Sequence, residues 1–121
     1  MDLDGVLSHY DGWQGVEHFG DPISGAVDIT KSLSQIFRVV IFTARLHGSR
    51  DQEVVLPLVQ GWLDRHGFAY DEIYTGSGKP FATAYIDDRG LSCRPQDEGV
   101  VAFERALANA KLLEAKKKPV E

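Results

Sequence analysis

Apolar residues recur every three or four positions in three stretches of the chain, which predicts three helices. The first follows a predicted N-cap at Ser24, the second runs from about Glu53 to His66, and the third from about Glu98 to Lys116. Pro57 fits only the first turn of a helix, so the second helix is predicted to begin slightly after Glu53. The predicted apolar faces are Ala26, Ile29, Leu33 and Ile36; Val55, Val59, Trp62 and His66; and Val100, Phe103, Leu107 and Ala110.

Short apolar runs between these helices predict β-strands. Residues 38–42 are largely β-branched and apolar, residues 82–86 form a second such run, and weaker runs cover residues 71–74 and 91–93. The polar, glycine-rich residues 5–23 show no clear period and predict a loop that has room for a short hairpin. Strands that alternate with helices predict an α/β fold with a mostly parallel sheet.

The composition is that of one ordinary globular domain. The 121 residues are 43% hydrophobic and 26% charged, with a formal net charge of -5. The negative charge disfavours broad nucleic-acid binding, and the single cysteine, Cys93, excludes an intrachain disulfide and fits a reducing compartment. No apolar run approaches the roughly 18 residues of a membrane span. We therefore expect a cytoplasmic protein without a membrane segment.

Two carboxylates stand at the start of the chain, at Asp2 and Asp4. If this segment ends a strand, both side chains point to the same side, and Gly5 lets the backbone turn just after them. Carboxylates held this close repel each other unless a proton or a cation lies between them. A divalent metal is the usual solution, so the pair predicts a metal site.

Further polar residues lie at the ends of the predicted strands, where parallel sheets bind ligands. Thr43 follows the first apolar strand, Lys79 precedes the next long one, and Asp87 and Asp88 follow it. A carboxylate can attack phosphorus, and a second carboxylic acid can protonate the leaving oxygen. A hydroxyl and an ammonium can stabilise phosphoryl oxygens, and further carboxylates can hold Mg²⁺. Together these groups predict phosphoryl transfer.

Four short segments contain these residues: Asp2-Leu3-Asp4-Gly5-Val6, Phe42-Thr43-Ala44-Arg45, Gly78-Lys79-Pro80 and Tyr85-Ile86-Asp87-Asp88-Arg89. In their order and spacing they resemble the four motifs of the haloacid dehalogenase (HAD) superfamily of phosphohydrolases. The chain is similar to small HAD-like hydrolases from phage and bacterial genomes. The resemblance implies a three-layer Rossmann-like fold with a mostly parallel central sheet, formed by a single domain over residues 1–121.

The resemblance also implies catalytic roles. Asp2 is expected to be the nucleophile, which forms an aspartyl-phosphate, and Asp4 the general acid/base. Thr43 and the N–H group of Ala44 are expected to bind the phosphoryl group. Lys79 is expected to neutralise both the nucleophile and the phosphate. An acidic residue at position 4 favours phosphatase over dehalogenase activity, because a dehalogenase needs no acid there.

The expected cofactor is Mg²⁺. The resemblance implies that Asp2 binds the metal through its carboxylate and Asp4 through its backbone carbonyl. Asp87 is expected to bind the metal directly or through water, with Asp88 as its partner. Which of these two lies nearer the metal stays open at the level of the sequence.

Most of the superfamily covers its site with an inserted cap, for which this chain has no space. The intervals Gly5–Ile23 and Thr75–Gly78 are too short to hold a cap domain, so an open site is expected. An open site suits a phosphorylated small molecule, protein or nucleic-acid end, or closure by a second subunit in a homo-oligomer. Residues 9–15 would form a flap, and Trp13 in it is a candidate for substrate binding because aromatic rings stack on bases and sugars.

Two other functions fit the same residue types. Receiver domains, which are phospho-accepting signalling and binding modules, also place acidic residues, a threonine and a lysine at strand ends. There the lysine comes last, whereas Lys79 precedes Asp87. The other candidate is a HAD-like domain with little or no activity, because the strand ahead of Asp2 is expected to be truncated to Met1. Arg45 is expected to form a salt bridge or lie in solvent.

Overall fold

The computed structural model describes residues 1–47 and 51–111 of the chain. The chain divides into two compact units, Met1–Asp88 and Arg89–Glu121, which are described separately here. The predicted organisation as a single domain over residues 1–121 stays a prediction.

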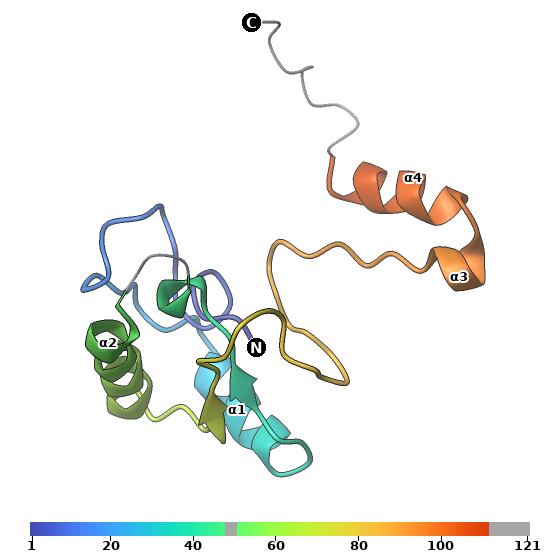
Figure 1. Ribbon diagram of the computed structural model, residues 1–121. Helices are drawn as coiled ribbons and strands as arrows, with labels where there is room; N and C mark the ends of the chain where they lie inside the picture. The colour runs from blue at the N-terminus through green and yellow to red at the C-terminus, as the bar shows by residue number, and fades with distance from the viewer. Residues whose placement is uncertain (48–50, 112–121) are drawn as a thin grey trace, which may run out of the picture. The chain divides into compact units, whose positions relative to one another are not determined.

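The first unit has a mixed α/β architecture around a small parallel sheet (Figure 1). Strands β1 (Val40–Ile41) and β2 (Glu72–Ile73) pair in parallel, with Val40 opposite Glu72 and Ile41 opposite Ile73. Parallel pairing requires a long crossover between the strands, and helix α2 (Gln52–Arg65) lies within it. The α/β class and the parallel pairing of these two predicted strands are therefore confirmed, although both strands are shorter than predicted.

The start of the chain is hydrogen-bonded on both of its sides. The N-terminal ammonium of Met1 donates to the carbonyl of Val40 (2.7 Å), and the Met1 carbonyl accepts from the N–H of Phe42 (2.9 Å). On the other side, the N–H of Asp2 donates to the carbonyl of Ile86 (2.9 Å). Asp2 therefore lies between the segment that continues β1 and the segment that ends in Asp87.

Helix α1 (Ala26–Ser34) differs from the prediction at its start and in its buried face. Its N-cap is Gly25, which has a φ of 83° and no capping side chain, so the predicted cap at Ser24 is wrong. Ala26 is buried and Leu33 partly buried as predicted, but Ile29 and the more distant Ile36 are exposed. The buried face instead includes Thr30, whose hydroxyl donates to the carbonyl of Val27 and accepts from the N–H of Ala69.

A short 3-10 helix, η1 (Ala44–Leu46), follows β1 and precedes α2. Helix α2 begins at Gln52 because the Asp51 carboxylate caps it by accepting from the N–H of Glu53 (2.9 Å). Pro57 lies in the second turn, so the prediction that this helix begins after Glu53 is wrong. Apolar burial along the following turns holds the helix together despite the hydrogen bond that proline cannot donate.

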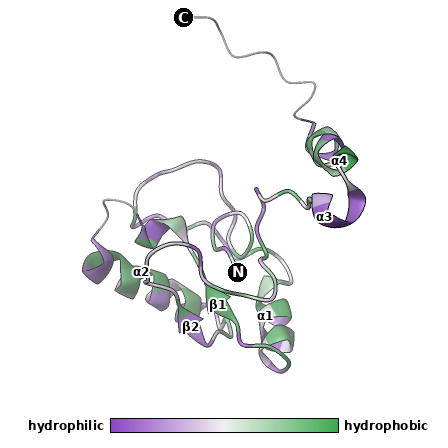
Figure 2. Ribbon diagram, turned by 45° about the vertical axis from the view of Figure 1, so that its right-hand side comes forward, coloured by the Kyte–Doolittle hydropathy of each residue, from purple (hydrophilic) through white to green (hydrophobic). Residues whose placement is uncertain are grey.

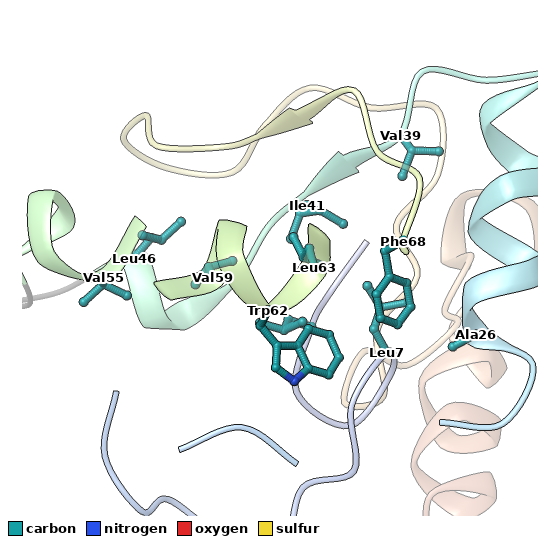
Figure 3. Close-up of a cluster of buried hydrophobic side chains, with 11 residues drawn as sticks. Leu7, Ala26, Val39, Ile41, Leu46, Val55, Val59, Trp62, Leu63 and Phe68 are labelled. Atoms are coloured by element: carbon teal, nitrogen blue, oxygen red, sulfur yellow. The ribbon is translucent and has the colours of Figure 1, made fainter. Parts of the chain in front are cut away.

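The core of the first unit forms where α2 meets β1 and the N-terminal segment. Figure 3 shows Ile41 of β1 beside Leu63 and Trp62 of α2, and Figure 2 shows hydrophobic residues along β1 and part of α2. Phe68 stacks on Trp62 with ring centroids 5.2 Å apart, and the half-buried His66 packs on the other part of that indole at 4.9 Å. The prediction that Trp62 packs in the core is confirmed, whereas His66 contacts Trp62 from the half-buried edge of the core. The buried core residues of this unit are Leu3, Leu7, Ala26, Val39, Ile41, Leu46, Val55, Val59, Trp62, Leu63 and Phe68.

The predicted strands at 82–86 and 91–93 do not form among the described residues. Every side chain from residue 81 to residue 94 is exposed, and Phe81 is fully so. A strand needs a continuous ladder of backbone hydrogen bonds to a neighbouring strand. Among the described residues, the backbone of residues 82–86 forms a single such bond, in which the carbonyl of Ile86 accepts from the N–H of Asp2. These expected strands are therefore corrected to extended, exposed chain.

The second unit contains two short helices, α3 (Pro95–Glu98) and α4 (Val101–Asn109). Gly99 separates them with a φ of 79°, a left-handed conformation that ends a helix, so the predicted continuous helix from Glu98 is wrong. Its predicted end at Lys116 lies outside the described residues. Ala102 and Ala106 are the buried residues of α4, whereas the predicted Val100 and Phe103 are exposed. No helix in the described part of the chain is both long and apolar enough to cross a membrane.

Candidate metal and phosphoryl site

Three carboxylates meet where the N-terminal segment lies beside residue 86. Asp2, Asp87 and Asp88 each offer an oxygen, and these oxygens lie within 4.8 Å of one another. Asp2 is half-buried, and the other two are exposed. Opposite ligands of an octahedral Mg²⁺ are roughly 4.2 Å apart, so small side-chain shifts would bring the three oxygens into range. A hard, all-oxygen donor set of this size fits Mg²⁺.

The surroundings of Asp2 disfavour the ionised form of its carboxyl group when no cation is bound. Burial raises the pKa of Asp2 to about 6, while the N–H of Leu3, which donates to its Oδ1 (2.8 Å), lowers the pKa. The negative charges of Asp87, Asp88 and Asp4 contribute smaller parts of this rise in the pKa of Asp2. A bound divalent cation would remove this repulsion and favour the ionised carboxylate.

Glycine is favoured at position 5 by the conformation of the backbone. Gly5 has a φ of 84°, in the left-handed region, and a Cβ atom placed on it would lie 2.3 Å from Oδ2 of Asp88. The turn after the first motif therefore brings the backbone directly against the acidic cluster.

Asp4 is not part of this cluster, because its carboxylate faces Arg45. Nε of Arg45 donates to Oδ2 of Asp4 (2.8 Å), and Nη2 donates to Oδ1 (3.0 Å), which makes a two-pronged ion pair. The Arg45 side chain is 3% exposed and that of Asp4 19% exposed. The Ser8 hydroxyl also donates to Oδ1 of Asp4 (3.4 Å). The pair is thus shielded from water and fixed in orientation.

Arg45 also holds the loop that follows the first motif. Its Nη1 donates to the carbonyl of Val16 (3.1 Å), and its Nη2 donates to the carbonyl of His18 (2.6 Å). The guanidinium carbon lies 4.0 Å from the ring centroid of Phe19 and 5.2 Å from that of Trp13. One arginine therefore joins the first motif, the second motif and the loop.

The loop is closed at its neck by backbone bonds. The N–H of His9 donates to the carbonyl of Asp21 (2.8 Å), and Ser8 bridges Pro22 in the antiparallel sense, which confirms the predicted short hairpin. Gly20 allows this closure, because a Cβ atom there would lie 2.0 Å from the carbonyl oxygen of His9. Between the loop and the ion pair lies a pocket of about 290 Å³, lined in part by Asp4 and Arg45.

Thr43 and Ala44 lie directly after β1, at the carboxyl end of the sheet. Thr43 is buried, and its hydroxyl oxygen accepts from the N–H of Arg45 (3.2 Å), so that Thr43 caps η1. The N–H of Phe42 donates to the carbonyl of Met1. Thr43 and Asp2, each one residue further along its segment, therefore lie at the same end of the paired segments. The structure thus brings the first, second and fourth motifs to one edge.

Lys79 is directed elsewhere. Its ammonium lies 4.1 Å from the ring centroid of Tyr85, and both residues of this cation–π contact are exposed. Asp2, Asp87 and Asp88 are therefore together, whereas Asp4 pairs with Arg45 and Lys79 with Tyr85. The sequence predicted a salt bridge as one possibility for Arg45, but it predicted neither its partner Asp4 nor its hydrogen bonds to the loop. The one indication in the sequence that Arg45 could lie at the site was its position two residues after Thr43.

The comparisons with known proteins bear on the fold alone. No protein-family model matches the chain, and no curated protein matches it. The chain is similar to a target protein from Vibrio cholerae known from its crystal structure, with 26% sequence identity and a TM-score of 0.52. The match covers 90% of this chain and 94% of that chain. That protein's name states no activity.

Proposed function

We propose that the protein is a Mg²⁺-dependent phosphatase of the HAD superfamily that hydrolyses phosphomonoesters through an aspartyl-phosphate on Asp2. The observation that carries the proposal is the grouping of Asp2 with Asp87 and Asp88, within 4.8 Å, from segments more than 80 residues apart in the sequence. The grouping joins the first and the fourth of the motif segments, which follow one another along the chain in the order typical of the superfamily.

The fold supports the proposal. In the superfamily the strand that carries the nucleophile is central to the sheet, and here Met1 and Asp2 are hydrogen-bonded on both sides, to Val40 and Phe42 and to Ile86. The parallel pairing of β1 with β2 supports a proposed parallel Rossmann-like sheet. We propose that α1 and α2 are the outer layers of such a three-layer fold (Figure 1).

The chemistry assigned to the chain has two steps. A carboxylate oxygen of Asp2 attacks phosphorus, the bond from phosphorus to the leaving oxygen breaks, and the leaving oxygen takes a proton from Asp4. Water then attacks phosphorus and gives a proton to Asp4, the bond between phosphorus and the Asp2 oxygen breaks, and inorganic phosphate leaves the regenerated Asp2 carboxylate. When bound, Mg²⁺ would neutralise part of the charge between the carboxylates and the incoming phosphate.

Positioning groups complete the proposed site. Thr43 and the N–H of Ala44 would hold the phosphoryl oxygens, and Lys79 would leave the ring of Tyr85 to neutralise the same group. Arg45 would keep the Asp4 carboxyl group aimed, and Oδ2, which accepts from Nε of Arg45, has a second lone pair that can hold the proton. Substrates would be phosphorylated small molecules or macromolecules.

Hydrolysis of p-nitrophenyl phosphate tests the proposal. We expect turnover with Mg²⁺, none with EDTA, and a loss of at least about 10³-fold in Asp2→Asn, because an amide is a poor nucleophile. Asp28→Asn, an exposed carboxylate on α1, is the matched control and keeps its activity. Metal-dependent turnover that survives in Asp2→Asn would disprove the nucleophile assignment.

A phospho-accepting module is the second candidate, and the position of Lys79 favours it. With Lys79 on Tyr85, an aspartyl-phosphate would lack one group that promotes its hydrolysis. Acetyl phosphate would then label Asp2 stoichiometrically without release of further phosphate. Rapid turnover of the label instead supports the phosphatase.

A further inference from the structure

The pocket beside the Asp4–Arg45 pair shares these two residues with the proposed site, and the phosphoryl chemistry gives no role to the loop residues that line the rest of it. It has a volume of about 290 Å³, and its walls come from the loop that Arg45 holds. Because Asp4 is the proposed donor of a proton to the leaving oxygen, the part of the substrate bound to that oxygen must lie on the Asp4 side. The pocket is therefore the space available to the leaving alcohol.

The side chains of the pocket have a defined charge. Asp11 and Asp21 both line it, and the one cationic guanidinium, that of Arg45, is already paired with Asp4. No lysine or second arginine is among the described lining residues to offset these two carboxylates. A leaving group with its own negative charge would be repelled here.

The same walls suit hydroxyl and amino groups. Carboxylates accept hydrogen bonds from hydroxyl and ammonium groups, and the imidazoles and the amide of Gln14 can accept or donate. The ring of Tyr10 lies in the lining and is partly exposed, so it can cover the apolar face of a sugar. The volume is in the range of small-molecule sites, at its lower end.

We infer that this pocket selects phosphomonoesters whose leaving alcohol is rich in hydroxyl groups and neutral or cationic, such as a sugar or amino sugar. Substrates with a second anionic group next to the ester, such as nucleic-acid ends and bisphosphates, are disfavoured. Arg45 acts in this selection as a positioning residue, because it fixes the loop through the carbonyls of Val16 and His18. The inference rests on the proposed phosphatase function.

Three esters of similar size and different charge test the selection. Glucosamine 6-phosphate, glucose 6-phosphate and 6-phosphogluconate release a cationic, a neutral and an anionic alcohol. We expect kcat/KM to fall in that order, with about tenfold between glucose 6-phosphate and 6-phosphogluconate, as estimated for unit charges several ångströms apart in a partly hydrated site. Equal values, or a preference for 6-phosphogluconate, would overturn the inference.

Charge-removing variants locate the effect in the pocket. Asp11→Asn/Asp21→Asn should reduce the preference for glucose 6-phosphate over 6-phosphogluconate severalfold, since the substitutions keep size and remove the repulsion. Asp28→Asn is the control for net charge and should leave the ratio unchanged, because Asp28 lies outside the pocket. An unchanged ratio in the double variant would show that the selection arises elsewhere.

Phosphate-free ligands separate this inference from the proposed function. If no ester and no p-nitrophenyl phosphate is hydrolysed, the phosphatase proposal has failed, and the pocket is tested by saturation-transfer NMR with glucosamine, glucose and gluconate. Signals from glucosamine and glucose, lost in Asp11→Asn/Asp21→Asn, support the pocket's specificity. Equal signals from gluconate contradict it.

Discussion

Replacing Arg45 tests whether one buried ion pair organises the site. Arg45→Met keeps the length of the side chain and removes the guanidinium. The change leaves the Asp4 carboxylate, 19% exposed, without its partner and the carbonyls of Val16 and His18 without their donor. Removing one member of a buried pair costs about 3–5 kcal/mol, because the remaining charge is desolvated and uncompensated.

This cost is large against the stability of the unit that contains the pair. At roughly 0.05–0.15 kcal/mol per residue, the unit Met1–Asp88 has a free energy of unfolding of about 4–13 kcal/mol. We therefore expect Arg45→Met to lower the midpoint of urea unfolding substantially. Fluorescence of Trp62, which is 3% exposed, reports the transition.

Two further variants make the measurement specific. Arg38→Met is the matched control. The Arg38 side chain is 67% exposed and that of its partner Glu72 46% exposed, so their ion pair should contribute less than about 1 kcal/mol. Asp4→Leu/Arg45→Met should recover part of the loss, because it leaves neither charge unpaired. A loss below about 1 kcal/mol in Arg45→Met, or one equal to that of Arg38→Met, would refute the reasoning.

Three other outcomes follow from the structure. The pKa of Asp2 is raised from 3.8 to about 6 in the folded protein, so ionisation of Asp2 opposes folding fully above pH 6 and not at all below pH 3.8. Urea titrations in EDTA should therefore show that, as the pH is lowered from 7 to 4, the unfolding free energy of the unmodified protein rises relative to that of Asp2→Asn. The shift corresponds to about 3 kcal/mol, which solvent screening of this half-exposed group reduces to about 1, and a difference that does not change with pH would contradict the reasoning. Gly20→Ala should raise amide exchange at His9 by opening the loop neck, whereas Gly61→Ala, with open space at its Cβ position, should leave this exchange unchanged. Equal exchange in the two variants would contradict the role of the close approach. Leu63→Ala should cost about 2–5 kcal/mol and Val54→Ala on the exposed side of α2 less than about 1, as measured by thermal unfolding, and equal losses would contradict the placement of the core.

Helix α2 and strand β1 could be predicted from the sequence, because both follow from the local spacing of apolar residues. The stripe of Val55, Val59 and Trp62 predicted α2 and its buried face, because helix spacing alone gathers these side chains. The short apolar run before Thr43 predicted β1 for a similar reason. The start of α2 was not predictable from Pro57, since burial along later turns outweighed the cost of one missing hydrogen bond.

The remaining elements depended on contacts between distant segments. Residues 82–86 have the composition of a strand, but a strand forms only where a neighbour supplies a ladder of backbone bonds, and here the N–H of Asp2 supplies one. The last predicted helix begins at Val101 rather than at about Glu98, because the left-handed Gly99 ends the short helix α3 just before it. Neither outcome follows from hydrophobic spacing.

The sequence by itself determined which chemical groups are present and in what order: the acidic pair, the threonine, the lysine and the second acidic pair. Only the tertiary structure decided which of them meet. It placed Asp2 with Asp87 and Asp88, turned Asp4 toward Arg45 and left Lys79 on Tyr85. The physical reason is that backbone hydrogen bonds from Met1 and Asp2 to Val40 and Ile86 hold distant segments side by side, so that the Asp2, Asp87 and Asp88 carboxylates meet despite their repulsion. That pairing depends on three-dimensional distance, which residue spacing along the chain does not specify.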